Sequence, residues 1–149
     1  MLIESRSATD PEIAALVVAQ QRELRDADGG LDGQVTVVHT DIHYLAAVVG
    51  GRAVGCGGLQ ALDADTGELK RMYVRPAFRG RGIARQLLVA LEELAFRAGH
   101  RTVCLETGTY LPAAISLYRS SGYEPIPVYG EYVDKPYSVC FAKRLPVAA

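Results

Sequence analysis

The chain has 149 residues, of which 49% are hydrophobic and 22% charged, and its formal net charge is −1. This length and composition favour a single globular domain over residues 1–149 and exclude a disordered or fibrous protein. The isoelectric point of about 6.3 disfavours a nucleic-acid partner, and no apolar run approaches the roughly 20 residues that a membrane-spanning helix requires.

The cysteines and the amino terminus bear on the compartment. Cys56, Cys104 and Cys140 are odd in number and far apart, so neither a disulfide framework nor a zinc cluster is expected. The first residues, MLIESRSATDPEIAAL, lack the basic flank and long apolar run of a secretory signal. We therefore expect a cytoplasmic protein.

The first quarter of the chain predicts a short strand over residues 2–7, followed by a helix. Thr9 or Asp10 can cap this helix, which runs to about Asp26 before the turn-forming segment DADGGLDG. Its apolar residues recur at helical spacing. They are Ile13, Leu16, Val17 and Leu24.

Three strands are predicted in the next part of the chain. Residues 44–49 and 52–62 read as two strands that Gly50 and Gly51 join in a tight hairpin. After a second turn, residues 68–74 (ELKRMYV) alternate in the manner of a strand.

The second half predicts helix, strand, helix and strand. A helix over about 82–98 repeats Ile83, Leu87, Leu91, Leu94 and Ala98, and it is followed by a strand over 101–107. A short helix lies within 112–123 and a final strand over 138–145. The whole order predicts a mixed α/β fold: a mostly antiparallel sheet, one strand–helix–strand unit in its middle, and flanking helices.

Charge is divided unevenly along the chain. Residues 1–69 hold 4 basic and 11 acidic residues, whereas residues 70–149 hold 12 basic and 6 acidic residues. An anionic ligand is therefore expected on the second half and a cationic partner on the first.

The densest basic segment is the loop VRPAFRGRGIARQLL between the central strand and its helix. The first backbone amides of a helix lack partners, and with the helix dipole they form an anion site. Gly80 and Gly82 allow a phosphate to approach the backbone, and Arg79, Arg81 and Arg85 add forked donors. A diphosphate fits such a loop better than a lone carboxylate. The flanking strand and helix favour this interpretation over a solvated glycine turn.

Other phosphate-binding motifs do not match this loop. The P-loop pattern is absent from the chain. A dinucleotide fingerprint would need Gly or Ala at Arg85, although Glu106 lies at a suitable distance downstream. The residues around the loop are not aromatic platforms for stacking bases, so a nucleic-acid interface is also disfavoured.

These features resemble the GNAT superfamily of acyl-coenzyme-A-dependent N-acyltransferases over roughly residues 44–145. The resemblance rests on the run from Arg79 to Ala84 and on Tyr118 followed by Gly122-Tyr123. It implies acetyl-CoA as acyl donor, with its phosphates on the loop and its pantetheine arm on the main chain of the preceding strand. The implied donor-binding residues are Met72, Tyr73, Val74, Arg79, Gly80, Arg81, Gly82, Ile83, Ala84 and Arg85.

The resemblance also implies the reaction: direct transfer of an acetyl group to a primary amine of a small molecule or peptide within a ternary complex. Glu68 is the expected proton acceptor, or else a solvated residue at the start of its strand. Tyr118 is the expected proton donor to the leaving thiolate, or else a core aromatic residue. Backbone N–H groups around Tyr73 are expected to stabilise the oxyanion.

One departure from the family pattern concerns the later helix. Many relatives begin it with an asparagine that contacts the cofactor, whereas this chain has Leu111-Pro112-Ala113-Ala114. A domain that holds acyl-CoA as a sensor or scaffold without turnover remains the alternative function. The resemblance also implies, at family level alone, a homodimer formed through the last strands.

The remaining polar residues carry weaker signals. His39 and His43 have metal-like spacing but no third ligand, so no metal site is expected. Cys104 lies in an apolar strand and is expected in the core. Six of the eight tyrosines fall between Tyr110 and Tyr137 and could line a substrate pocket. Four acidic residues of the first half could attract a cationic amine: Asp26, Asp28, Asp32 and Asp41.

Overall fold

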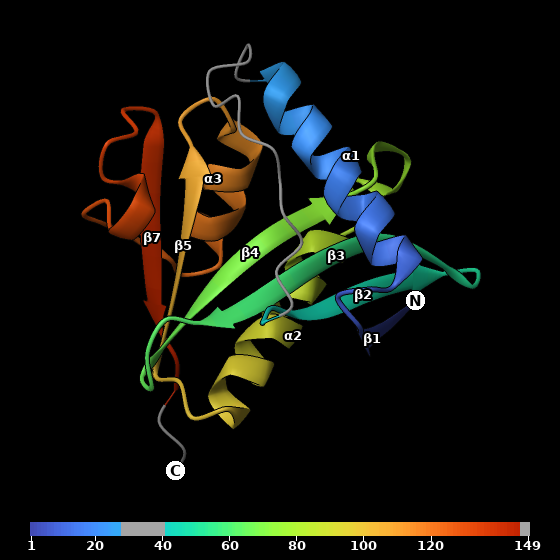
Figure 1. The fold of residues 1–149 in the computed structure, drawn as a ribbon, viewed down its shortest axis with the longest axis horizontal. Coiled ribbons are helices and arrows are strands. Elements are labelled where there is room, and N and C mark those ends of the chain that lie inside the picture. The colour runs from blue at the N-terminus through green and yellow to red at the C-terminus, as the bar shows by residue number, and fades with distance from the viewer. Residues whose placement is uncertain (28–40, 147–149) are drawn as a thin grey trace.

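A seven-stranded sheet forms the centre of the structure, a computed structural model that describes residues 1–27 and 41–146 (Figure 1). The strands are β1 (Leu2–Arg6), β2 (His43–Val49), β3 (Arg52–Ala61), β4 (Thr66–Val74), β5 (Thr102–Gly108), β6 (Glu124–Ile126) and β7 (Ser138–Arg144). The helices are α1 (Pro11–Ala27), α2 (Ile83–Arg97) and α3 (Pro112–Ser120), with 3₁₀ turns at Pro76–Phe78 and Gly130–Tyr132.

The strand order is β1-β2-β3-β4-β5-β7-β6, and β4 and β5 form the parallel pair at its centre. This pairing is short. It joins Thr66, Gly67 and Glu68 to Thr102, Val103 and Cys104. Beyond Glu68 the two strands diverge, and Figure 1 shows the gap that opens between them. The other neighbouring strands pair in antiparallel fashion.

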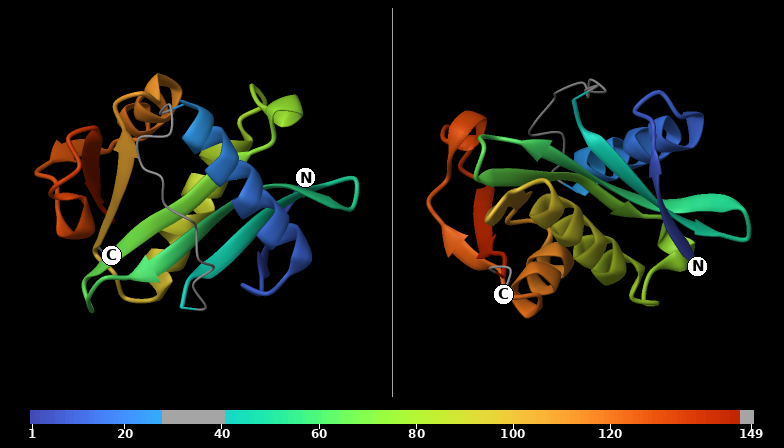
Figure 2. Two further views of the ribbon diagram at one scale, coloured as in Figure 1. Left: turned by 45° about the horizontal axis from the view of Figure 1, so that its top comes forward. Right: turned by 90° about the horizontal axis from the view of Figure 1, so that it is seen from below.

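Helices cover both faces of the sheet, with α1 on one face and α2 on the other (Figure 2). The core on the α2 face is the larger and includes Leu45, Val54, Leu69, Leu87, Leu91, Leu105, Tyr118 and Phe141. The core on the α1 face includes Ile13, Leu16, Val17, Tyr44, Cys56 and Tyr73. Because successive strand residues face opposite sides, β2, β3 and β4 contribute residues to both cores.

Side-chain hydrogen bonds fix the start of α1. Asp10 Oδ1 accepts from the N–H groups of Glu12 (2.8 Å) and Ile13 (3.2 Å), so Asp10 rather than Thr9 caps the helix. Glu12 Oε2 then accepts from the N–H of Ala53 at 2.8 Å, which ties the first turn of α1 to the β2–β3 hairpin.

The predicted mixed α/β fold is confirmed, and each predicted strand and helix is present with small changes at its ends. One strand was missed: β6 has only three residues and contains Pro125, so it shows no alternation. The stripe of α2 also differs, since Ala98 is exposed and Leu88 and Ala95 are buried instead. These two residues face the sheet because the buried side of α2 is wider than a single stripe.

Candidate active site

The basic loop connects the end of β4 to the start of α2. Gly80 and Gly82 adopt φ angles of 79° and 78°, which other residues rarely adopt, and a Cβ at either position would meet no atom within 4 Å. The first helical hydrogen bond joins the Gln86 N–H to the Gly82 carbonyl at 3.1 Å. The amides of residues 82–85 therefore have no acceptor within the helix. They form an open cradle that matches the predicted anion site.

The three predicted phosphate-binding arginines lie around this cradle but differ in orientation. Arg79 donates to the Val74 carbonyl (2.8 Å) and to Glu23 of α1 (2.7 Å), so its guanidinium faces α1. Arg85 donates to the hydroxyls of Ser120 and Ser121 at the end of α3.

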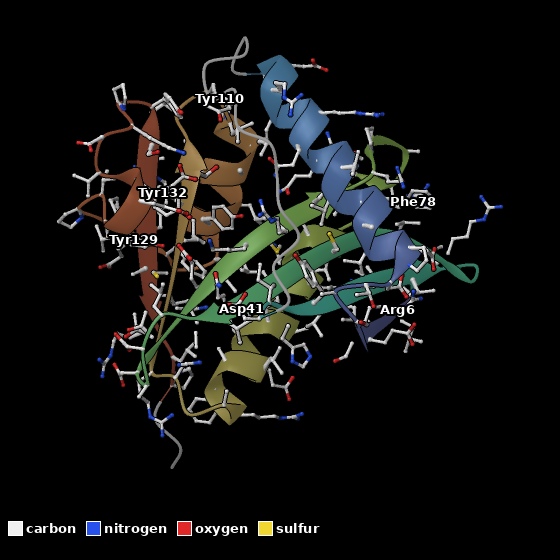
Figure 3. All side chains as sticks on the ribbon, in the orientation of Figure 1. Arg6, Asp41, Phe78, Tyr110, Tyr129 and Tyr132 are labelled. Atoms are coloured by element: carbon white, nitrogen blue, oxygen red, sulfur yellow. The ribbon has the colours of Figure 1, made fainter. Side chains whose placement is uncertain are left out.

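Arg81 differs from both, because its guanidinium stacks 5.1 Å from the centroid of the Phe78 ring, within the loop itself (Figure 3 labels Phe78). It is an exposed residue. Arg81 can therefore bind a ligand on the cradle without first breaking hydrogen bonds to α1 or α3, as Arg79 and Arg85 must.

The edge of β4 beyond Glu68 is not paired with β5. There the carbonyls of Met72 and Val74 accept hydrogen bonds from side chains, those of Gln20 (3.1 Å) and Arg79 (2.8 Å), instead of from a strand. An extended ligand could bind along such an edge in the manner of an added strand. The predicted pantetheine-binding residues lie together on this edge.

Glu68 is buried beside the gap, with 3% of its surface exposed, so it is not the solvated residue that the sequence allowed. Its neighbour Leu69 belongs to the core on the α2 face, and Glu68 therefore points to the α1 face. Its carboxylate accepts hydrogen bonds from the hydroxyls of Tyr129 (2.6 Å) and Tyr132 (3.3 Å) and lies 3.3 Å from the ammonium of Lys70.

The two tyrosines that contact Glu68 lie beside β5 and β7 (Figure 3). Burial, together with the charge of Glu68, raises the pKa of both hydroxyls. They therefore stay protonated at neutral pH and donate to the carboxylate. Sequence reasoning noted a cluster of tyrosines here but did not connect it to Glu68.

Tyr118 lies in the core on the α2 face, 7% exposed, with its ring 5.9 Å from that of Tyr123. Burial, with a contribution from the charge of Glu106, raises the pKa of Tyr118 to about 12. The hydroxyl is thus protonated at neutral pH. Tyr118 is therefore a core aromatic residue, and this position is also compatible with the predicted role as proton donor.

Glu106 is a site residue that sequence reasoning missed. It lies two positions beyond Cys104, the last β5 residue that pairs with β4, and its carboxylate accepts a hydrogen bond of 2.6 Å from the Ser138 hydroxyl. The signal was present: alternation along RTVCLET puts Glu106 on the face of Cys104, and Cys104 pairs with Glu68. Two carboxylates therefore face the α1 side of the gap.

The other predicted polar residues lie away from the gap or outside the described ranges. His43 is within hydrogen-bond distance of Ser5 (2.9 Å), while His39, Asp28 and Asp32 lie outside the described residues. Within residues 1–27 and 41–146, no three His, Cys, Asp or Glu residues form a group that could hold a metal ion.

Three other residues that the sequence singled out have different surroundings. Asp26 is exposed at the end of α1, and Asp41 accepts a hydrogen bond of 2.6 Å from Gln60. Cys104 is buried, and this burial raises the pKa of its thiol to about 11.

None of the helices in the described ranges combines the length and apolar content that a membrane crossing needs.

The Acetyltransferase (GNAT) family matches residues 10–123, a span that contains α1, the β4–β5 gap, the loop and α3. This chain belongs to the GNAT family. It is an acetyltransferase whose acyl donor is acetyl-CoA. The loop fits the diphosphate of that donor, because its amides are open and its glycines leave no Cβ in the way.

Two GNAT relatives are close enough to compare in detail. The IAA acetyltransferase of Azospirillum brasilense is 40% identical over 112 residues, which cover 74% of this chain and 72% of the relative. A Klebsiella pneumoniae protein described as an acyl-CoA N-acyltransferase is 34% identical, with a TM-score of 0.84 over 97% of both chains.

With a third protein this chain shares the fold alone. A GNAT acetyltransferase of Elizabethkingia anophelis, with acetyl-CoA bound, has a TM-score of 0.74 over 97% of both chains at 19% identity. The divergent sheet of this chain is thus the GNAT fold.

Proposed function

We propose that this chain transfers the acetyl group directly to a primary amine of a small molecule or peptide, with donor and acceptor bound at the same time. One observation carries the proposal: Glu68 is buried on the α1 face where the pairing of β4 with β5 ends, and Tyr118 lies in the core on the α2 face, near enough to Glu106 of β5 for that charge to raise its pKa. A proton acceptor and a proton donor on opposite sides let the two substrates approach from opposite faces.

The donor binds along the loop and the open edge of β4. The amides of residues 82–85 and the guanidinium of Arg81 hold the diphosphate, and the main chain of residues 72–74 holds the pantetheine arm. Bound acetyl-CoA supplies a thioester whose carbonyl carbon the amine attacks. Backbone N–H groups near Tyr73 face the acetyl oxygen.

Glu68 and Tyr118 move the protons. The acceptor amine is mostly protonated at neutral pH, and Glu68 takes its proton directly or through a water molecule. Tyr129 and Tyr132 hold the carboxylate in place. Tyr118 then donates to the coenzyme A sulfur as it leaves, which its pKa of about 12 permits at any physiological pH.

Kinetics with thiol detection test this function. Purified protein, acetyl-CoA and a panel of amines should release coenzyme A thiol, and initial rates at varied concentrations should give the intersecting lines of a ternary complex. Parallel lines would instead indicate a covalent acetyl-enzyme. Tight coenzyme A binding with no thiol release across the panel would favour the sensor or scaffold alternative.

Location and assembly complete the proposal. Three free, buried cysteines support a reducing compartment, and we place the activity in the cytoplasm. We also propose that residues 1–149 act as one catalytic domain, which pairs through β6 and β7 in a homodimer. Light scattering at several concentrations tests the dimer, and a monomer throughout the range would contradict it.

A further inference from the structure

Two backbone carbonyls of β4 point toward the edge that β5 leaves unpaired. The strand has a bulge at Arg71, where φ is 60° and the register with β3 shifts. Beyond the bulge, the N–H of Arg75 donates to the Val54 carbonyl of β3 at 2.9 Å. The N–H and the C=O of a trans peptide point in opposite directions, so the Val74 carbonyl points away from β3. By alternation along the strand, the Met72 carbonyl does so too.

A side chain of α1 already binds one of these carbonyls. Helix α1 lies against β3 and β4 (Figure 1), and the Nε2 amide of Gln20 donates to the Met72 carbonyl at 3.1 Å. This carboxamide is the same kind of donor as the amide groups in the pantetheine arm of coenzyme A. The Met72 carbonyl thus has two competing partners, which are Gln20 and the pantetheine arm.

An ion pair makes a second contact between α1 and the donor site. The guanidinium of Arg79 donates to Glu23 at 2.7 Å, and Glu23 lies on the same face of α1 as Gln20, three residues further on. The guanidinium also lies 5.5 Å from the centroid of the Tyr73 ring, which belongs to the core on the α1 face. Arg79 is therefore held on the α1 side of the sheet.

The two bonds of Arg79 use different nitrogens. Its Nε donates to the Val74 carbonyl, whereas Nη2 donates to Glu23. The outer end of the guanidinium can therefore exchange the Glu23 carboxylate for a phosphate while the bond to Val74 remains. A phosphate and a carboxylate are alternative partners for the same forked donor.

We propose that Gln20 and Glu23 form a latch, through their contacts with Met72 and Arg79, and that this latch competes with acetyl-CoA for the donor site. Gln20 competes with the pantetheine arm, and Glu23 competes with the diphosphate. Binding of the donor therefore releases the end of α1 from β4. Before the donor binds, the latch protects an edge that could pair with another strand. This inference rests on the donor site of the proposed function, because it assigns that site a competitor within the chain.

The affinity for coenzyme A, measured by calorimetry, tests the ion pair of the latch. Glu23→Gln should bind coenzyme A about 2- to 5-fold more tightly, because a partly exposed ion pair no longer has to be broken. The melting temperature of the ligand-free variant should equal that of the wild type or lie slightly below it. If the contact only positions Arg79 for the phosphate, the affinity should be unchanged or lower, and either result would overturn the proposal.

Two controls assign the gain to the contact itself. Asp26→Asn removes the same charge from an exposed position of the same helix and should bind coenzyme A as the wild type does. In an Arg79→Ala background, Glu23→Gln should have no effect on the affinity, because its partner is gone. An equal gain in Asp26→Asn, or a gain that persists without Arg79, would contradict the latch.

Gln20→Leu tests the other contact. It keeps a side chain of similar size without the amide donor, so it should bind both coenzyme A and pantetheine about 2- to 10-fold more tightly. Glu23→Gln should leave the affinity for pantetheine, measured by displacement of coenzyme A, unchanged, because pantetheine lacks the diphosphate. If Gln20→Leu binds neither ligand more tightly, Gln20 does not compete with the donor and the proposal fails.

Amide hydrogen exchange separates this inference from the proposed function. Bound coenzyme A should slow exchange at residues 72–74 and speed it along residues 20–27, where the latch opens. Unchanged exchange at residues 72–74 would contradict the proposed donor site, and the latch with it. Slower exchange there, with slower or unchanged exchange along residues 20–27, would contradict the latch alone. Binding as described, without thiol release from acetyl-CoA, would contradict the acetyl transfer and leave the latch intact.

Discussion

Tyr129 donates a hydrogen bond of 2.6 Å to Glu68 across 61 positions of the sequence. The bond joins the segment before β7 to the last residue of β4 that pairs with β5. It places a carboxylate with a fixed orientation at the point where the sheet opens.

Replacing Glu68 with glutamine should lower kcat about 100-fold or more, because the amine loses its proton acceptor while the side chain keeps its size. The Kd of coenzyme A, measured by calorimetry, should not change. Glu124→Gln, an exposed position on β6, is the control and should leave both constants unaltered. A larger loss of kcat in Glu106→Gln than in Glu68→Gln would transfer the role to Glu106.

Replacing Tyr118 with phenylalanine should lower kcat roughly 10- to 100-fold, because the leaving thiolate loses a proton donor. Since the pKa of Tyr118 is about 12, ionisation of this hydroxyl should not reduce the wild-type rate between pH 8 and about 10. With an acyl donor whose leaving thiol is more acidic, kcat should fall less in this variant. If both thioesters lose activity equally, the hydroxyl acts elsewhere.

The pKa of Tyr118 also predicts how stability depends on pH. A hydroxyl whose pKa rises on folding from about 10 to about 12 adds stability that is fully present below pH 10 and is lost as pH rises through 12. The urea concentration at the midpoint of unfolding should therefore decrease as the pH rises from 10 to 12. Tyr118→Phe should show a shallower fall, and an identical fall in both proteins would contradict the assignment.

The loop is tested by the affinity for coenzyme A. Arg81→Ala should weaken it about 10-fold, because one charge-assisted contact with phosphate is lost. Arg79→Ala should weaken it and also lower the free energy of unfolding, since Arg79 joins the loop to α1 through Glu23. Neither variant should change affinity for pantetheine, which lacks the phosphates. Unchanged coenzyme A affinity in both variants would rule out the phosphate assignment.

Gly82→Ala separates backbone shape from space at the loop. A Cβ meets nothing there, but the φ of 78° is strained for alanine, so the variant should lose about 1 kcal/mol of stability. Differential scanning calorimetry measures this loss. The affinity of the variant for coenzyme A should also decrease. Gly51→Ala, with a φ of 80° in the hairpin, should lose similar stability with no change in affinity.

Local patterns were enough to predict most of the fold. Alternation identified β4 and β5, and the glycines beside an apolar helical repeat identified the loop and α2. The sequence could not predict the orientation of Arg79, because its partner Glu23 lies 56 positions away. A contact between distant segments depends on how α1 packs on the sheet, and no local signal carries that information.

The bulge at Arg71 escaped prediction for a related reason. The run ELKRMYV alternates well enough to pass as a regular strand, and an arginine with positive φ has no sequence signature. The burial of Glu68 was likewise invisible, since it depends on Tyr129 and Tyr132 from the segment before β7. Pattern therefore located the strand that carries the site, while the packing of later segments determined its chemistry.

Only three residue pairs join β4 to β5, so the sheet consists of two halves with a weak seam between them. A donor bound along the open edge of β4 would span this seam and supply hydrogen bonds that no strand provides. Coenzyme A should then slow amide hydrogen exchange at the ends of both strands. It should also raise the melting temperature, with an increase that grows with the logarithm of the coenzyme A concentration. The acyl donor would thus be a structural part of the sheet as well as a substrate.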